Sequence, residues 1–453
     1  MAGNQRIHPS TRNPFYWEYG GRMQLLVGGS NDDNLFQWTG SDLTDHLDLL
    51  VDCGGNYVRN TMSDRDPGNV YAFDRGADGR FDLSRKNREY WERLETFLTE
   101  TSNRGVVVEL TLWDQHDLWP EAWKEHPWNP ECNANYSVET LTSAGAFFRT
   151  VEEKNEAVLE HQRRFVEWIL ELSLPFGNVL YNINNESWTG LDWERYWARM
   201  VREKAADRKQ IVSVTTMHLS PSTSVRAFMN DRELYDFAEI SQNNQVAMGN
   251  EGQAHMDELL RWRGLISGQA AAPMNNEKIY GGGEVGHANF GSAAEAQRRF
   301  WRNIYGGCAS VRFHRPADRE LGLGLTETAQ RMIRSADMFL EAFDLFGAVP
   351  ANDLFVECGD DRAYCLASIG KEYAFYFTDG GTIAFDPWVY VESLEVRWLN
   401  IDESRWAGES ERVDVEWEFY TVFTGDRSQA ANRGVCRLAC PAGGQWLAVA
   451  TAN

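Results

Sequence analysis

The chain alternates between short apolar runs and longer stretches in which apolar residues recur every three or four positions. The short runs have the length of β-strands, and the longer stretches have the periodicity of helices that turn one face to a core. Eight candidate strands follow one another, at 23–29, 56–61, 106–113, 178–184, 211–216, 237–241, 278–283 and 309–313. Because a helical stretch follows each strand, the pattern predicts an α/β fold, a (β/α)8 TIM barrel.

The pattern changes near Val349, where helical periodicity ends and short alternating segments separated by turn residues take over. Asp379-Gly380-Gly381 is one such turn. This pattern of short alternating segments and turns is typical of a small all-β sandwich. We therefore expect two domains that pack directly, a catalytic barrel at 1–348 and an accessory sandwich at 349–453.

Composition and charge restrict the partners. The hydrophobic share of 43% and the charged share of 25% are typical of a globular protein, and the net charge of −23 disfavours nucleic acid and anionic membranes. No apolar stretch approaches the roughly 20 residues that span a bilayer. We expect a cytoplasmic protein, or a secreted one whose signal peptide has been removed.

Cysteine and tryptophan add two weaker signals. The seven cysteines form no CxxC pair and are expected to be mostly free thiols, although Cys358 with Cys365, or Cys436 with Cys440, leaves a bridge open. We predict no metal site and no cofactor. The 18 tryptophans suit a protein that binds sugar rings, but most tryptophans in a large barrel pack its core.

The residues just after the barrel strands carry the candidate chemistry, because reactive groups of this fold lie at the carboxyl ends of its strands. Every predicted strand is followed by polar residues. Glu186 follows the fourth strand and Glu284 the seventh, and these two strands face one another across a barrel of eight. Two opposed carboxyl groups are what hydrolysis of a glycosidic bond needs.

The motif Ile183-Asn-Asn-Glu-Ser187 resembles the Asn-Glu motif of clan A glycoside hydrolases. The resemblance extends over the whole barrel and implies that Glu186 is the general acid/base and Glu284 the nucleophile of a retaining enzyme. It also implies that Asn185 binds a sugar hydroxyl and that Arg59 steadies the nucleophile. The C-terminal segment resembles the collagen-binding-type β-sandwich that is often appended to apiosidase-like barrels.

The resemblance is incomplete after the sixth and eighth strands, where Gln242-Asn243-Asn244-Gln245 and Arg312-Phe313-His314 replace the usual residues. The identity of the sugar therefore stays open, and an oligosaccharide, polysaccharide or glycoside is the expected substrate. Residues expected to line the substrate cleft, besides Arg59 and Asn185, are Asn60, Trp113, His116, His218, Asn243, Asn244 and His314.

The mechanism sets conditions on the two carboxyl groups. Retention requires them to lie about 5 to 5.5 Å apart, and inversion about 6.5 to 9.5 Å. We expect Arg59 to lower the pKa of Glu284, which must be ionised. We expect burial beside tryptophan and the second carboxyl to raise the pKa of Glu186, which must start protonated.

Other interpretations of the sequence are weaker. Gly281, Gly283 and Gly286 spell the dinucleotide-binding pattern G-x-G-x-x-G, but no helix follows directly and Glu284 lies inside it. A serine hydrolase lacks its G-x-S-x-G elbow, and a zinc hydrolase lacks H-E-x-x-H. The main alternative is a catalytically inactive barrel that binds carbohydrate or a protein.

Overall fold

The computed structural model describes residues 6–244, 251–268, 271–285, 288–316, 322–424 and 427–453. Within these ranges eight parallel strands, in chain order, form the barrel: β4 (Leu26–Gly29), β5 (Tyr57–Thr61), β8 (Val107–Asp114), β9 (Val179–Asn185), β10 (Val214–Thr215), β11 (Ala238–Glu239), β12 (Met274–Asn275) and β15 (Ser310–Phe313). Six of them make one sheet, β10-β9-β8-β5-β4-β15, and β11 pairs with β12. Backbone bonds from Asp236 to Val214 and from Ala309 to Met274 close the ring.

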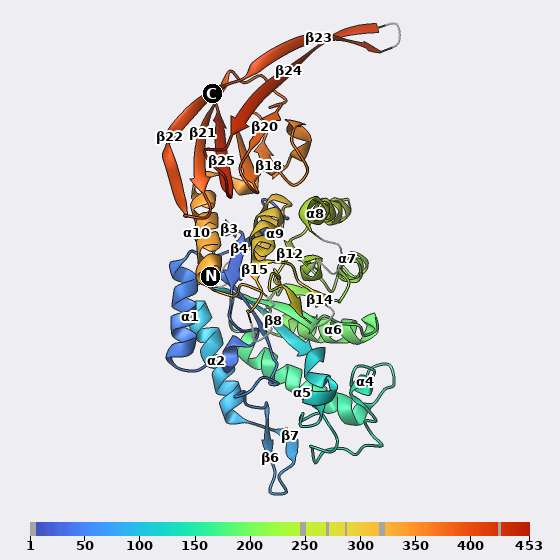
Figure 1. Cartoon of the computed structure of the whole chain (residues 1–453). Coiled ribbons are helices and arrows are strands. Elements are labelled where there is room, and N and C mark those ends of the chain that lie inside the picture. The colour runs from blue at the N-terminus through green and yellow to red at the C-terminus, as the bar shows by residue number, and fades with distance from the viewer. Residues whose placement is uncertain (1–5, 245–250, 269–270, 286–287, 317–321, 425–426) are drawn as a thin grey trace.

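Helices cover the outside of the barrel (Figure 1). They are α1 (Ser41–Asp52), α2 (Arg88–Asn103), α5 (Glu156–Ser173), α6 (Leu191–Asp207), α7 (Pro221–Asn230), α8 (Gly252–Ser267), α9 (Ala293–Tyr305) and α10 (Glu327–Ala342). As the sequence predicts, Ser292 caps α9 by accepting a hydrogen bond from the Glu295 amide at 3.1 Å. No described helix is long and apolar enough to cross a membrane.

Smaller elements fill the loops and the N-terminal end of the barrel. They are the sheet of β1 (His8–Pro9), β2 (Trp17–Tyr19) and β3 (Arg22–Gln24), the pair β6 (Phe73–Arg75) and β7 (Phe81–Lys86), the pair β13 (Glu284–Val285) and β14 (Ala288–Asn289), the short helices α3 (Pro120–Trp123) and α4 (Ala144–Phe147), and the 3-10 turns η1 (Leu35–Gln37), η2 (Gln115–Leu118), η3 (Ser241–Asn244), η5 (Leu345–Gly347) and η6 (Asn352–Leu354).

The seventh barrel strand lies earlier than the sequence predicts. We expected it at 278–283, but the strand that pairs with β11 is β12, Met274–Asn275. Of the expected run, Ile279 and Tyr280 make only isolated bridges, the first of them parallel to Phe313. The residues that follow the seventh strand are therefore Asn276, Glu277 and Lys278.

The C-terminal part is the predicted antiparallel sandwich. One sheet has the order β16 (Val349–Pro350), β18 (Ala363–Ser368), β19 (Glu372–Phe377), β25 (Trp446–Ala452), β21 (Ser393–Asn400) and β22 (Arg405–Asp414). The other has the order β17 (Phe355–Glu357), β20 (Thr382–Phe385), β24 (Arg427–Ala439) and β23 (Glu416–Thr424), and the pair β23–β24 projects from it as a long ribbon (Figure 1). The predicted fold class is confirmed.

The sandwich packs directly on the barrel through α9 and α10. Arg302 on α9 donates to Asp361 at 2.8 Å, and Ser335 on α10 donates to the carbonyl of Ile401 at 3.0 Å. Trp301 and Tyr376 bring their rings to 5.9 Å. All seven cysteines lie in the described ranges, and all are free thiols.

Candidate active site

Glu186 lies directly after β9, at the carboxyl end of the fourth barrel strand. Its φ of 51° is left-handed, a conformation that a non-glycine residue adopts only when its surroundings impose it. Gln115 holds this backbone by donating its side-chain amide to the carbonyl of Glu186. Ser187 continues the chain by donating its amide to Met217 at 2.8 Å. The surroundings thus hold Glu186 in a strained position at the mouth of the barrel.

The two carboxylate oxygens of Glu186 face different partners. Oε2 lies 3.0 Å from Nε2 of His116. Oε1 accepts hydrogen bonds from Gln242 at 2.9 Å and from the Tyr280 hydroxyl at 3.1 Å, and it forms an ion pair with Lys278. Four side chains from the loops after the third, sixth and seventh strands therefore converge on one carboxylate.

These contacts decide the charge of Glu186. Burial alone would raise its pKa, but the Lys278 ammonium and His116 hold it well below the usual range. Our expectation that burial would keep Glu186 protonated is therefore wrong for the free protein. Lys278 was not among the predicted partners of Glu186, and its positive charge outweighs the cost of burial.

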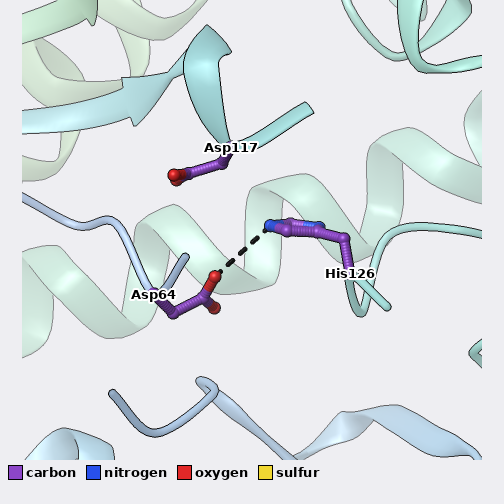
Figure 2. A group of neighbouring side chains, drawn as sticks. All are labelled: Asp64, Asp117 and His126. Carbon is purple, nitrogen blue, oxygen red and sulfur yellow. Dashed lines mark ion pairs between the residues drawn. The ribbon is translucent and has the colours of Figure 1, made fainter. Parts of the chain in front are cut away.

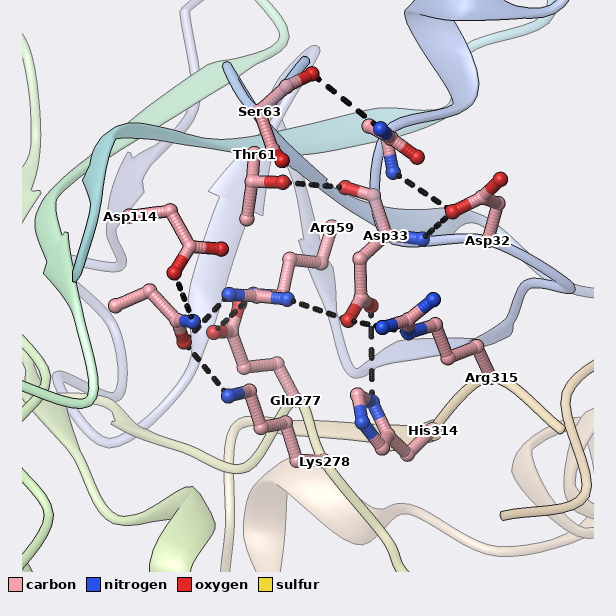
Figure 3. Close-up of polar contacts among 12 residues, drawn as sticks. Asp32, Asp33, Arg59, Thr61, Ser63, Asp114, Glu277, Lys278, His314 and Arg315 are labelled. Atoms are coloured by element: carbon pink, nitrogen blue, oxygen red, sulfur yellow. Dashed lines mark hydrogen bonds and ion pairs between the residues drawn. The ribbon is translucent and has the colours of Figure 1, made fainter. Parts of the chain in front are cut away.

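Arg59 on β5 is fully buried and connects the site (Figure 3). Its Nε lies 2.8 Å from the carboxylate of Glu277, and its Nη1 lies 3.1 Å from Asp33. Its Nη2 donates to Asn185 Oδ1 at 2.7 Å, and the same oxygen accepts from Lys278 at 2.6 Å. One continuous polar cluster thus runs from Glu277 through Arg59, Asn185 and Lys278 to Glu186.

Asp33, in the loop after the first strand, is surrounded by three arginines and a histidine. Arg312 and Arg315 approach it at 3.2 and 3.3 Å, in addition to Arg59, and His314, whose own pKa burial holds well below its usual range, lies 3.6 Å away. Burial alone would raise the pKa of Asp33, but these neighbours hold it well below the usual range. Asp33 is therefore a fixed anion that anchors Arg59.

Glu277 belongs to a group of three fully buried carboxyl groups, with Glu109 on β8 and Glu239 on β11, whose oxygens lie within 4.8 Å of one another. Burial raises the pKa of all three, repulsion between the carboxyl groups adds to the rise at Glu239 and Glu277, and Arg59 opposes the rise at Glu277 and Glu109. Such groups share protons and titrate together. Arg59 contacts Glu277 at 2.8 Å and opposes the rise in its pKa without cancelling it.

Glu284 lies in β13, whose backbone pairs with β14 so that residue 284 is opposite Asn289. Its side chain lies outside the described residues. The prediction that Glu284 is the nucleophile therefore stays a prediction, and Arg59, which we expected to steady it, contacts Glu277 instead.

The other predicted cleft residues separate into two groups. His116 and Asn185 contact Glu186 or its cluster, and His314 contacts Asp33 and stacks edge-on against Tyr280. The remaining predicted residues are buried and contact other partners. Asn60 accepts a hydrogen bond from the Phe36 amide, His218 pairs with Glu194, and Asn243 is buried in η3. Asn244 forms hydrogen bonds with His255, Asn276 and Asn303, and Trp113 packs among the rings of Trp128, Phe147, Phe165, Trp193 and Trp197.

Several residues of the site were not among those predicted, namely Asp33, Gln115, Gln242, Glu277, Lys278 and Tyr280. Lys278 carried a signal, since this chain has only seven lysines and one of them begins the expected seventh strand. Glu277 was missed because the expected strand began one residue after it.

A second polar cluster beside the site has the residue types of a metal centre. Asp64, Asp117 and His126 lie together, with His126 Nε2 3.4 Å from Asp64 (Figure 2). However, Nδ1 of His126 accepts the Trp128 amide at 3.3 Å, which puts the ring proton on Nε2, where it faces Asp64 instead of leaving a free lone pair for a metal. Arg65 pairs with Asp117 at 2.6 Å. Partners within the chain account for this cluster, which joins the loops after β5 and β8.

Comparisons with known proteins place the fold. No family model and no curated protein matches the sequence. A solved structure of a glycoside hydrolase family 5 protein from Bacteroides vulgatus has 13% identity and a TM-score of 0.67, over 99% of this chain and 94% of its own. A family 5 mannosidase from Rhizomucor miehei, a mutant solved in complex with mannosyl-fructose, has 12% identity and a TM-score of 0.53, over 75% of this chain and 98% of its own.

A maltogenic α-amylase from Thermotoga neapolitana has 10% identity and a TM-score of 0.53, over 95% of this chain and 99% of its own. These structures have the fold of clan A glycoside hydrolases and related barrels, and at such low identity the likeness concerns the fold alone. The alignment with the Bacteroides vulgatus protein includes the sandwich, so the two-part architecture recurs there.

Proposed function

We propose that this protein is a retaining glycoside hydrolase in which Glu186 is the general acid/base. The observation that carries the proposal is the polar cluster that joins Glu186 to Glu277 through Arg59, Asn185 and Lys278 at the carboxyl ends of opposite barrel strands. The glycoside hydrolases that share the fold support the same reaction class.

For the nucleophile there are two candidates. The sequence motif favours Glu284, and the described contacts favour Glu277, because Arg59 contacts it and it lies two residues after the end of β12. We propose Glu277, since a guanidinium at 2.8 Å favours the ionised carboxylate that the reaction needs.

In the first step a carboxylate oxygen of the nucleophile attacks the anomeric carbon, the bond to the leaving oxygen breaks, and that oxygen takes the proton of Glu186. In the second step water gives a proton to Glu186, attacks the anomeric carbon and releases the nucleophile. Glu186 must therefore gain a proton before the first step, and Lys278 limits how much of the protein carries it.

That ion pair is also the observation that favours the second candidate function, a barrel that binds carbohydrate without hydrolysing it. An acid that is held ionised by a lysine is a poor proton donor. The two functions differ in one respect that is easy to measure, which is turnover.

The test is a panel of aryl glycosides with the product anomer followed by NMR. We expect hydrolysis with retention, and we expect a 2-deoxy-2-fluoro glycoside of the preferred sugar to label one glutamate covalently. Mass spectrometry of the labelled peptide distinguishes Glu277 from Glu284, and Glu277→Gln and Glu284→Gln provide matched variants. An inverted product would reject the retaining mechanism, and glycan binding without turnover would establish the binder.

A further inference from the structure

The main chain of Glu277 lies just beyond the end of a very short β-ladder. β11 and β12 have two residues each, and the last backbone hydrogen bond between them joins the Ile240 amide to the Asn275 carbonyl at 3.0 Å. Glu277 follows two residues later, and its carbonyl accepts a hydrogen bond from Arg312 at 2.8 Å. Because a nucleophile must keep its position relative to the anomeric carbon, the group that holds the Glu277 amide matters for the proposed reaction.

Ser241, the first residue of η3, continues the connection where the ladder ends. Its fully buried hydroxyl accepts a hydrogen bond from the Glu277 amide at 2.7 Å. The same hydroxyl donates to Oε1 of Glu239, which also accepts the Ser241 amide at 2.6 Å. Since a serine hydroxyl has a single hydrogen, its bond to Glu239 fixes the rotation of the hydroxyl and leaves a lone pair for the Glu277 amide.

The surroundings of Glu239 favour a neutral carboxyl group. Burial and the neighbouring carboxyl groups of Glu277 and Glu109 raise its pKa, so it keeps its proton. Oε1 already accepts two hydrogen bonds, whereas Oε2 makes none with the described residues, which assigns the proton to Oε2. A neutral Glu239 supplies Ser241 with an acceptor without adding a negative charge beside Glu277.

We propose that Glu239 and Ser241 are positioning residues for the nucleophile: Glu239 orients the Ser241 hydroxyl, and this hydroxyl holds the main chain of Glu277. The inference rests on the proposed glycosidase function and adds to it two residues that act through Glu277. A displacement of the nucleophile by about 1 Å can cost on the order of 10²-fold in rate, so loss of this hydroxyl should slow the nucleophilic step and leave substrate binding in place.

The experiment isolates the nucleophilic step with a 2-deoxy-2-fluoro glycosyl fluoride of the preferred sugar, whose leaving group needs no proton from Glu186. For Ser241→Ala we expect the rate constant of covalent inactivation to fall about 10- to 100-fold, and the dissociation constant of the reagent to change less than about twofold. Ser224→Ala is the matched control and should change neither value. Ser224 is also a buried serine whose hydroxyl accepts a main-chain amide after a barrel strand, that of His218 at 2.8 Å.

Two substitutions of Glu239 separate positioning from packing. In Glu239→Gln the amide oxygen still accepts from Ser241 and the amide nitrogen replaces the protonated oxygen, so the inactivation rate constant should stay within about threefold of the parent value. Glu239→Met removes the acceptor and should reproduce the loss of Ser241→Ala. Circular dichroism checks that each variant folds, and the two Glu239 variants decide the question if Ser241→Ala does not.

Mass spectrometry of the labelled peptide distinguishes the possible failures. A label on Glu277 at the parent rate in Ser241→Ala would overturn the positioning role, and so would equal losses in Glu239→Gln and Glu239→Met. A label on Glu284 would reject Glu277 as the nucleophile, and this inference with it, but would keep the retaining glycosidase. A parent that is not labelled and hydrolyses no glycoside would instead reject the proposed function.

Discussion

At the scale of single residues, the charge of Glu186 dominates the chemistry. Burial would ordinarily favour the protonated form of this carboxyl, but Lys278 reverses this by contributing a buried positive charge at the same oxygen. A general acid in such surroundings is most effective under acidic conditions, where the protonated fraction is larger.

We predict that Lys278→Met raises the pKa of Glu186, because it removes the cation that stabilises the carboxylate. If Glu186 is the general acid, the alkaline limb of the kcat/KM profile will move to higher pH in this variant. The measurement is kcat/KM against pH on an aryl glycoside. Lys204→Met is the control, since Lys204 pairs with Glu167 on the outer helices, and it should leave the profile in place. If the alkaline limb of Lys278→Met stayed at the pH of the parent, Lys278 would not control the ionisation that the profile reports.

Glu186 itself should be replaceable without loss of the fold. We predict that Glu186→Gln lowers kcat/KM by about 10²- to 10⁴-fold on a glycoside with a poor leaving group, and by less when the leaving group needs no proton. Circular dichroism checks that the variant folds. Unchanged turnover on both substrates would remove Glu186 from the mechanism.

At the scale of elements, β8, β11 and β12 bring three carboxyl groups into the barrel interior. The pKa of Glu239 is raised because burial and the carboxyl groups of Glu277 and Glu109 oppose its ionisation. The folded chain therefore keeps a proton there that the unfolded chain releases. This contribution to stability is complete below the ordinary pKa of a glutamate and is lost as pH rises through the raised value.

We predict that the free energy of unfolding of the parent falls as the pH rises above the ordinary pKa of a glutamate, and that Glu239→Gln reduces the fall, because the amide cannot ionise. Urea unfolding of both proteins across this pH range provides the values. Glu357→Gln, on the exposed surface of the sandwich, should retain the slope of the parent. Parallel curves for parent and Glu239→Gln would mean that the proton resides elsewhere in the group.

The elements also show which strands could be predicted from the sequence. Long apolar runs such as the one before Trp113 predicted their strands well, because strands buried on both faces are nearly continuous in apolar residues. β12 has only two residues and is followed by Asn276, Glu277 and Lys278, so no apolar run marked it. The apolar pattern therefore indicated the next apolar segment as the seventh strand, and the carboxylate of Glu277, after the true strand, was missed. The position of Glu186 could be predicted, whereas Lys278 as its partner depends on side-chain directions that no local pattern contains.

At the scale of the whole molecule, the barrel and the sandwich share one buried ionic contact. Arg302 is fully buried on α9 and pairs with both Glu295 of its own helix and Asp361 of the sandwich. Burial makes such a charge costly unless it is paired, so the Arg302 guanidinium relies on these two carboxylates. The tertiary contact therefore connects the stability of the barrel to the presence of the sandwich.

We predict that Arg302→Met destabilises the protein by about 3 kcal/mol, because it leaves Asp361 without its cation and Glu295 with Arg299 alone, at 3.5 Å. Arg437→Met is the matched control. It breaks an ion pair on the exposed surface of the sandwich, where the expected cost is about 0 to 1 kcal/mol. Denaturant unfolding followed by tryptophan fluorescence gives both values. If Arg302→Met instead produced two separate transitions with an unchanged first midpoint, the sandwich would be an independent unit that does not support the barrel.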